Sequence, residues 1–277
     1  MSRRLAILLA AATSLAFAQD QPPAAPSSPP AQNPATEPAK PATEPAKPAT
    51  EPAKPAKPAP EPAKPQIEKL GEGRYRIGTV TIDQKKREIR FPTKVNMAEG
   101  LVEFLLCLQQ GKIHEALLIT EISPTHLSLA FTLLRFPPSN ELFSTIDETG
   151  HMTGLYPEVP LAVKAGARIA IEVEWNDNGT TRRNPVNEWL QHSRKNTAMM
   201  AGPWLYTGSD FYEGKFVPEM TGDLAAIMVV PAALINYPGS DNDDNVWFGF
   251  PKRVPPKDTP VTVIITPFYK PRTLPKP

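Results

Sequence analysis

The sequence predicts an α+β domain, mainly antiparallel β with one or two short helices, preceded by a disordered proline-rich segment. Short apolar runs bounded by turn residues recur from residue 75 onward and predict strands. In two places a polar capping residue stands directly before a proline, which is a helix-start signal. The proline-rich stretch lies ahead of all of these and has a different composition.

The first residues have the pattern of a cleavable export signal. Arg3 and Arg4 precede an apolar stretch that ends in the small-x-small sequence of residues 16–18. This stretch is shorter than the roughly 20 apolar residues that cross a bilayer. We therefore expect residues 1–18 to be a signal peptide, with an uncleaved anchor as the alternative. The mature protein is then periplasmic or extracellular and has no integral membrane span.

Residues 19–66 are predicted to form a disordered tether rich in proline, alanine, lysine and glutamate. A heptad, Ala-Thr-Glu-Pro-Ala-Lys-Pro, begins at Ala35, Ala42 and Ala49. Two prolines in each repeat exclude a coiled coil, and no large apolar residue is present to build its seam. Proline density favours an extended polyproline II spacer. A ligand for a polyproline-reading partner is the alternative.

Residues 67–277 are expected to form a single folded domain. The whole chain has a formal net charge of +1, so no strong field favours nucleic acid as a partner. Cys107 is the only cysteine, which excludes an internal disulfide and leaves packing to hold the core. Strands are predicted at residues 75–83, 88–91, 101–107, 113–120, 168–175, 224–230, 246–250 and 261–266.

Two of these strands and two helices bear on function. The strands at 101–107 and 113–120 are expected to form a hairpin around Gly111. A helix is predicted to start at Ser123-Pro124, because its apolar residues share one stripe as far as Leu134. A second, short helix is predicted to start at Asn184-Pro185.

Several stretches together resemble the YdjY-domain family of exported bacterial proteins. The most specific is the Gly-Lys-x-His-Glu sequence of residues 111–115. The resemblance also rests on residues 91–96, 103–107, 116–118, 124–134, 171–175, 204–209, 222–224, 241–244 and 254–263. It implies one exported domain and no assigned activity. A lone cysteine also excludes a cysteine-bound iron–sulfur cluster.

Four residues are candidate metal ligands: Cys107, His114, Glu115 and His126. A hairpin around Gly111 would place Cys107 near His114, and a thiolate, two imidazoles and a carboxylate suit zinc. Glu115 would then act as general base on a metal-bound water. Against this, Cys107 lies among leucines, and adjacent residues of a strand face opposite sides. A Cys–His nucleophilic pair is a further alternative.

Two other groups of residues suggest binding. The acidic loop at residues 241–245 has calcium-type ligands without the spacing of an EF-hand, and the same residues favour turns. Large aromatic side chains can line a glycan or peptide groove, although most such residues are core. They are Trp175, Trp189, Trp204, Tyr206, Phe211, Tyr212 and Trp247.

No established catalytic motif appears in the sequence. The sequence therefore favours a non-enzymatic envelope module on a flexible tether, whose partner is a cell-wall component or an envelope protein. The alternative is a metal-binding domain or a metal-dependent periplasmic hydrolase centred on His114. No cofactor is identified by the sequence.

Overall fold

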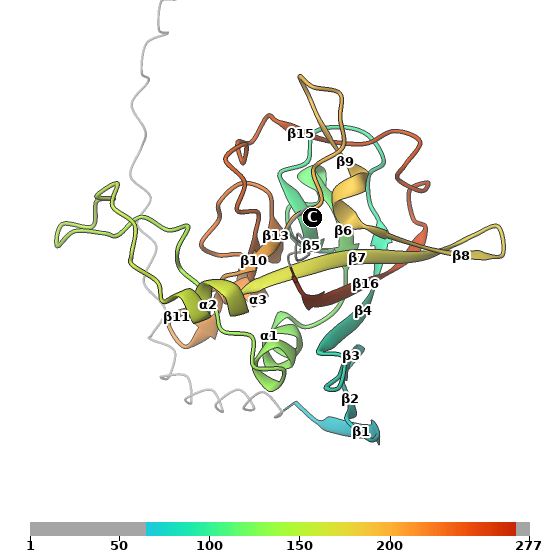
Figure 1. Cartoon of the computed structure of the whole chain (residues 1–277), viewed down its shortest axis with the longest axis horizontal. Coiled ribbons are helices and arrows are strands. Elements are labelled where there is room, and N and C mark those ends of the chain that lie inside the picture. The colour runs from blue at the N-terminus through green and yellow to red at the C-terminus, as the bar shows by residue number, and fades with distance from the viewer. Residues whose placement is uncertain (1–64, 270–277) are drawn as a thin grey trace, which may run out of the picture. The chain divides into compact units, whose positions relative to one another are not determined.

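The computed structural model describes residues 65–269 (Figure 1). The predicted signal peptide and almost all of the predicted tether lie outside the described residues. The fold is mostly β, with 38% strand and 14% helix, and contains a mixed barrel of eight strands. The prediction of a mainly antiparallel α+β domain is therefore wrong.

The barrel closes because β4 pairs with β6 as well as with β16. The strand order around it is β4–β16–β7–β10–β14–β13–β5–β6. The bounds are Glu88–Val95 (β4), Pro260–Pro267 (β16), Arg168–Asp177 (β7), Trp204–Tyr206 (β10), Ile235–Asn236 (β14), Asp223–Ala226 (β13), Phe104–Leu108 (β5) and Ala116–Thr120 (β6). The β13–β14 and β5–β6 pairings are parallel, and the others are antiparallel.

The pairing of strands β5 and β6 differs from the hairpin predicted around Gly111. No hairpin forms around Gly111, because Phe104 pairs with Ala116 and Leu108 with Thr120 in parallel register. Residues 109–115 instead run back along the strands and end in a 3-10 helix, Ile113–Glu115 (η1). Both strands are buried along their whole length, as parallel strands usually are. In these two strands apolar residues follow one another without alternation, so the sequence does not indicate the direction in which they pair.

Shorter strands extend the barrel sheet or lie beside it. The meander β1 (Ile67–Gly71), β2 (Arg74–Ile77) and β3 (Val80–Asp83) leads into β4, and β8 (Thr180–Pro185) forms a hairpin with β7. Separate pairs are β9 (Leu190–His192) with β15 (Trp247–Gly249), and β11 (Phe211–Tyr212) with β12 (Lys215–Phe216).

The sequence predicts a single strand at residues 75–83, but the structure has two strands there, β2 and β3. Gly78 turns the chain between them with a φ of 58°. A Cβ built there would lie 2.6 Å from Nδ1 of His126, so the turn has no room for a side chain.

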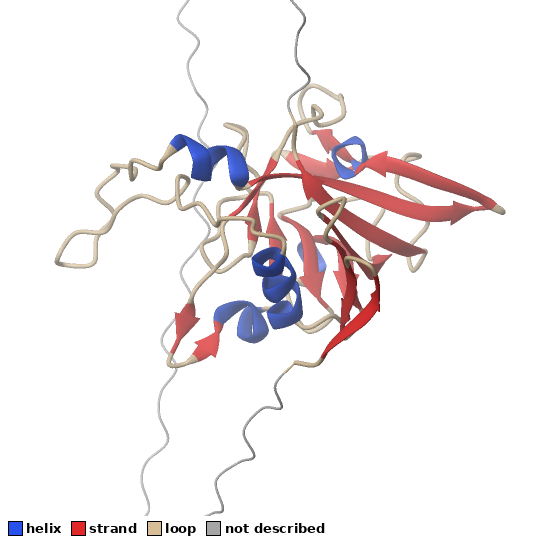
Figure 2. Ribbon diagram, turned by 60° about the horizontal axis from the view of Figure 1, so that its bottom comes forward, coloured by secondary structure: helices blue, strands red, loops and turns tan. Residues whose placement is uncertain are grey.

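Helix α1 (Pro124–Leu133) confirms the helix predicted after Ser123. The Ser123 hydroxyl accepts a hydrogen bond from the backbone N–H of His126, as an N-cap does. Phe131 faces the barrel and stacks on Tyr206, with ring centroids 4.0 Å apart. Figure 2 shows this helix packed against the strands.

The remaining helices are short. The helix predicted at Asn184 is only a 3-10 turn, Val186–Trp189 (η2), and β9 follows it directly. Helices α2 (Leu161–Gly166) and α3 (Val217–Thr221) have no counterpart in the prediction. Within residues 65–269, no helix is long and apolar enough to cross a membrane.

Strand β7 confirms the clearest strand prediction and spans the domain. Its residues Ile169, Ile171 and Val173 are buried in the barrel core, while Glu172 and Glu174 lie on the opposite face. This alternation is the period-two pattern from which the strand was predicted. Figure 1 shows β7 running from α2 at one end to the β8 hairpin at the other.

Candidate functional site

The four residues predicted to bind a metal lie in separate places. Cys107 is fully buried on β5, whereas His114 is exposed on η1. His126 lies on α1, beyond the opposite end of β6, with its ring against Gly78. Among the described residues, no group of three or more His, Cys, Asp or Glu side chains is arranged to hold a metal ion. The structure does not bring the predicted ligands together, and the metal site stays a prediction.

Glu115 lies close to another acidic residue, Glu103. Burial, and next the neighbouring Glu115 carboxylate, raise the pKa of Glu103. Asp244, from the acidic loop, raises it further, while Lys112 lowers it. The structure thus brings one residue of the predicted metal site toward the acidic loop, and neither histidine accompanies it.

The Gly-Lys-x-His-Glu segment takes part in an ion pair between the half-exposed side chain of Lys112 and the buried carboxylate of Asp223. Nζ of Lys112 donates to Oδ2 of Asp223 over 2.7 Å. The same ammonium group lies 4.5 Å from the centre of the Phe104 ring. Asp223 begins β13 and is paired with Cys107 of β5. The connection that runs back along β5 therefore places Lys112 over this pair of strands.

Two glycines let the connection approach β13 closely. A Cβ built on Gly222 would lie 2.8 Å from Cα of Gly111, a distance that real Cβ atoms essentially never show. Gly222 also has a φ of 79°, the left-handed conformation that glycine adopts without strain. The carbonyl of Gly222 accepts a hydrogen bond from the N–H of Leu108 at 2.8 Å. Backbone contact thus replaces side-chain packing at this point.

One oxygen of the Asp223 carboxylate in this ion pair is left without a partner among the described residues. The Asp223 side chain is 1% exposed, and its second oxygen, Oδ1, is buried without a hydrogen-bond partner among the described residues. Burial first, and the Asp223 carboxylate second, raise the pKa of the Cys107 thiol to about 12. The raised pKa disfavours the thiolate, which is the nucleophilic form of cysteine. These contacts hold β5, β13 and the connection together, which is a structural role.

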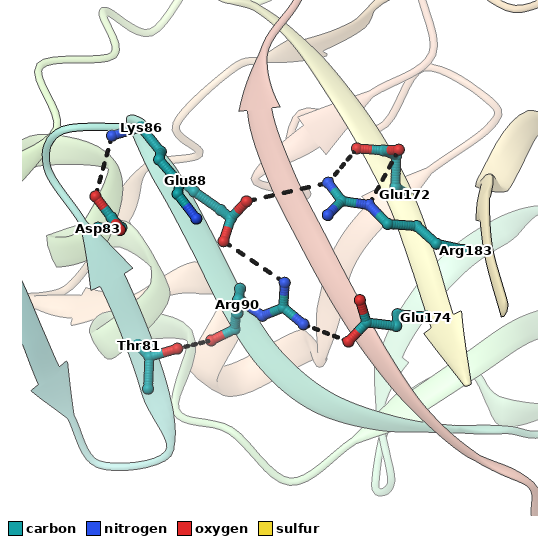
Figure 3. A network of polar contacts seen from close by, with 8 residues as sticks. All are labelled: Thr81, Asp83, Lys86, Glu88, Arg90, Glu172, Glu174 and Arg183. Atoms are coloured by element: carbon teal, nitrogen blue, oxygen red, sulfur yellow. Dashed lines mark hydrogen bonds and ion pairs between the residues drawn. The ribbon is translucent and has the colours of Figure 1, made fainter. Parts of the chain in front are cut away.

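A larger charged network lies on the outer face of the barrel (Figure 3). Arg90 of β4 bonds to Glu174 of β7 and lies 3.6 Å from Glu88. Arg183 of β8 donates to Glu172 at 2.6 Å and reaches Glu88 at 4.0 Å. The five side chains join β4, β7 and β8 across the intervening β16.

The network covers an apolar residue of β16. Ile264 pairs with Arg90 on one side and Glu172 on the other. Its neighbours Val263 and Ile265 belong to the core, so Ile264 faces outward, yet it is 0% exposed. The hydrocarbon stems of the charged side chains are well suited to such cover. The network is thus both an electrostatic and a packing feature of this face.

The aromatic residues divide into core and surface. Trp189, Trp204, Tyr206 and Trp247 are buried. Trp175 is half-buried. Phe211 and Tyr212 are 67% and 61% exposed. A groove lined by the tryptophans together is therefore not formed, because most of them fill the barrel.

Two loops at the α2 end of β7 expose most of the large apolar side chains that reach solvent. One is residues 140–160 together with Leu161, the first residue of α2, and the other contains β11, β12 and α3. Both lie on the α2 side of the barrel in Figures 1 and 2. The exposed residues are Ile146, Met152, Leu155, Tyr156 and Leu161 in the first loop and Phe211, Tyr212 and Met220 in the second. We call the two loops that carry these eight residues the apolar loops.

These features define a closed, mixed β-barrel domain whose Gly-Lys-x-His-Glu segment forms an ion pair with a buried carboxylate. The family model for the YdjY domain matches residues 80–266. The chain belongs to the YdjY-domain family, as the sequence resemblance predicted, and the family brings no assigned activity. No curated protein and no solved structure matches the chain.

Asp223 was missed among the candidate residues, although residues 222–224 were part of the family resemblance. A signal was available: an acidic residue directly before an apolar run, where solvent exposure is not expected. Its partner, Lys112, lies 111 residues earlier. No periodicity connects residues so far apart.

Proposed function

We propose that the protein is an exported module of the cell envelope that binds another envelope protein through the apolar loops and catalyses no reaction. The proposal is carried by one observation, the exposure of eight large apolar side chains on two loops of the same side of the barrel. Exposed apolar clusters of this kind usually mark interaction sites. The predicted signal peptide and tether support the location, since a spacer extends the reach of a binding domain.

The longer of the two loops is internally ordered, which favours recognition over simple disorder. The N–H of Thr145 bonds to the carbonyl of Leu155 at 2.7 Å, and the N–H of Thr153 bonds to the carbonyl of Thr145 at 2.9 Å. At the tip, the Asp147 carboxylate accepts bonds from the hydroxyl and N–H of Thr149 and from the N–H of His151. These bonds, the Thr149 hydroxyl first, lower the pKa of Asp147.

This hydrogen bonding holds the loop in shape while its apolar side chains stay exposed. Ile146 and Met152 face each other across a β-bridge, and they are 66% and 79% exposed. The second loop is held similarly, since the rings of Phe211 and Phe216 lie 5.1 Å apart across the β11–β12 pair. A preformed apolar surface binds with a smaller loss of conformational entropy than a disordered one.

Site-specific photo-crosslinking in the cells that produce the protein tests the proposal. A crosslinking amino acid at Met152 or at Tyr212 of the full chain should yield the same discrete protein adduct. Lys85, which is exposed on the β3–β4 turn, is the control position and should give no such adduct. Equal adducts at Lys85, or none at the two loop positions, would overturn the proposal. A triple variant, Ile146→Ser/Met152→Ser/Leu155→Ser, should remove the Tyr212 adduct without lowering the melting temperature.

A further inference from the structure

A separate pocket lies at the other end of β7, under the β7–β8 hairpin. Its volume is about 440 Å³, within the range of about 300–1,000 Å³ that small-molecule sites occupy. One wall is the end of β7 with the turn that follows it, and the other wall is the loop before β16. The residues that line the pocket include Trp175, Asn176, Asp177, Lys252, Arg253 and Pro255.

Trp175 supplies a flat apolar surface to this pocket. The other three tryptophans are at most 3% exposed, whereas Trp175 is only half-buried. It continues the core-facing side of β7 beyond Val173, at a point where the hairpin extends past the core. Its ring packs edge-on against Trp189 at 5.1 Å, which fixes its orientation. Pro255 adds apolar surface from the opposite loop.

A carboxylate lies on the same face of β7 as Trp175, because Asp177 is two residues further along the strand. The Asp177 carboxylate pairs with Arg182 at 3.3 Å, and its side chain stays 44% exposed. The oxygen of Asn176 accepts from the N–H of Gly179 at 2.7 Å, which holds the turn after β7. A carboxylate acceptor beside an aromatic side chain suits the hydroxyl groups of a sugar.

The opposite loop makes the pocket positive. Lys252 and Arg253 line it, and neither forms an ion pair with any residue that the structure describes. The guanidinium of Arg253 stacks on the Phe250 ring at 4.3 Å, which limits its orientations. Lys252 has a φ of 68°, a conformation that non-glycine residues rarely adopt and that occurs often at functional sites. Because Arg182 already neutralises Asp177, the two cations are left for a ligand.

We propose that this pocket binds a saccharide unit that carries a carboxylate. The pyranose face packs on Trp175, a hydroxyl group bonds to Asp177, and the carboxylate pairs with Lys252 and Arg253. A neutral sugar leaves the two cations unpaired, and a peptide carboxylate offers no hydroxyl donors to Asp177. The inference goes beyond the proposed function, because it concerns the end of β7 away from the apolar loops and does not depend on them.

Calorimetric titration of the full-length mature protein tests the pocket with three probes. They are a β-1,4-linked N-acetylglucosamine–N-acetylmuramic acid disaccharide, the neutral disaccharide chitobiose, and the dipeptide alanyl-alanine. We expect the acidic disaccharide to bind about tenfold or more tightly than either other probe, the size of one charge-assisted contact. Binding should also change tryptophan fluorescence.

Lys252→Glu should weaken binding of the acidic disaccharide by about tenfold or more and leave chitobiose binding unchanged. Lys195→Glu, an equal charge change at an exposed turn residue away from the pocket, should change neither. No binding of the acidic disaccharide at millimolar concentration would overturn the inference, as would equal affinity for chitobiose. Equal affinity for the dipeptide would show a carboxylate site instead. Each result is independent of the crosslinking at Met152 and Tyr212.

Discussion

The Lys112–Asp223 ion pair and the outer-face network use the same chemistry but bury different partners. Lys112 is 48% exposed, whereas the Asp223 carboxylate that it contacts is buried with an oxygen that has no partner among the described residues. The network on β4, β7 and β8 has four contacts among five side chains, each 11–38% exposed. A buried charge depends on its partner far more than an exposed one, because water can solvate the latter. Removing the cation beside the buried Asp223 carboxylate should therefore matter more than removing any contact of the network.

Lys112→Met should have the largest effect, because it leaves the Asp223 carboxylate buried without a cation. A buried polar group left without its partner costs about 1–3 kcal/mol, and the site of the 48% exposed Lys112 is open to water, so the free energy of unfolding should fall within that range. Urea denaturation measures it. The double variant Lys112→Met/Asp223→Leu removes both charges and should recover most of the loss. If the free energy of unfolding of Lys112→Met lay within about 0.5 kcal/mol of that of the parent protein, this ranking would be contradicted.

Alkaline pH should reveal the same interior cluster through Cys107. Its pKa is raised to about 12 from 9.0, so the folded protein keeps a proton that the unfolded chain releases. The contribution of the Cys107 thiol to the free energy of unfolding is complete below about pH 9. It is lost as pH rises toward 12, at up to about 1.4 kcal/mol per pH unit. Unfolding in urea at pH 8 and pH 10.5 should show a steeper decline for the parent than for Cys107→Ala. Parallel declines would mean that the thiol is not the group responsible.

Arg90→Met should have a smaller effect on the outer face. The variant loses the contacts with Glu88 and Glu174 but keeps a hydrocarbon stem of similar length over Ile264. Partly exposed ion pairs contribute about 1 kcal/mol or less, so the free energy of unfolding should fall by about that amount. The effect should shrink at high salt, unlike that of Lys112→Met. A double-mutant cycle with Glu174→Gln would measure the coupling energy between Arg90 and Glu174. If Arg90→Met lowered the free energy of unfolding as much as Lys112→Met does, the two ion-pair settings would not differ as we expect.

His114→Ala should have the smallest effect, although His114 is two residues from Lys112. Its side chain is exposed on η1, and surface substitutions usually change stability by no more than about 0.5 kcal/mol. Elemental mass spectrometry of the purified full chain and the variant provides a second readout. We expect both to contain the same metal content. Stoichiometric zinc that disappears in the variant would support the hydrolase alternative and contradict this expectation.

Local patterns in the sequence predicted individual elements better than their arrangement. The alternation of β7 and the cap at Ser123 lie within a few residues, and both predictions are confirmed. The break at Gly78 was missed because the apolar pattern continues through it, while the constraint comes from His126. Barrel closure was missed for the same reason, since the contact of β4 with β6 depends on the whole chain path.

In the candidate site, too, the sequence failed to predict which residues distant along the chain lie together. Cys107 was correctly weighed as a core residue, yet its proximity to His114 depended on a hairpin that does not form. The actual neighbours of Cys107 are Asp223, from a strand far along the chain, and Lys112, from the connection that runs back over it. Two glycines make that approach possible, and their contact is invisible until the strands are placed.

The meander before the barrel has a mechanical consequence. Among residues 65–269, strand β1 pairs with β2 alone, and nearly all of its side chains are exposed. A force on residue 65 pulls first on the pair between Ile67 and Ile77, because the strand enters the sheet there. The hydrogen bonds are then loaded one pair at a time, as in unzipping, and not all together as in shear. Releasing the five residues of β1 would add about 17 Å of chain at low force, while the closed barrel stays intact.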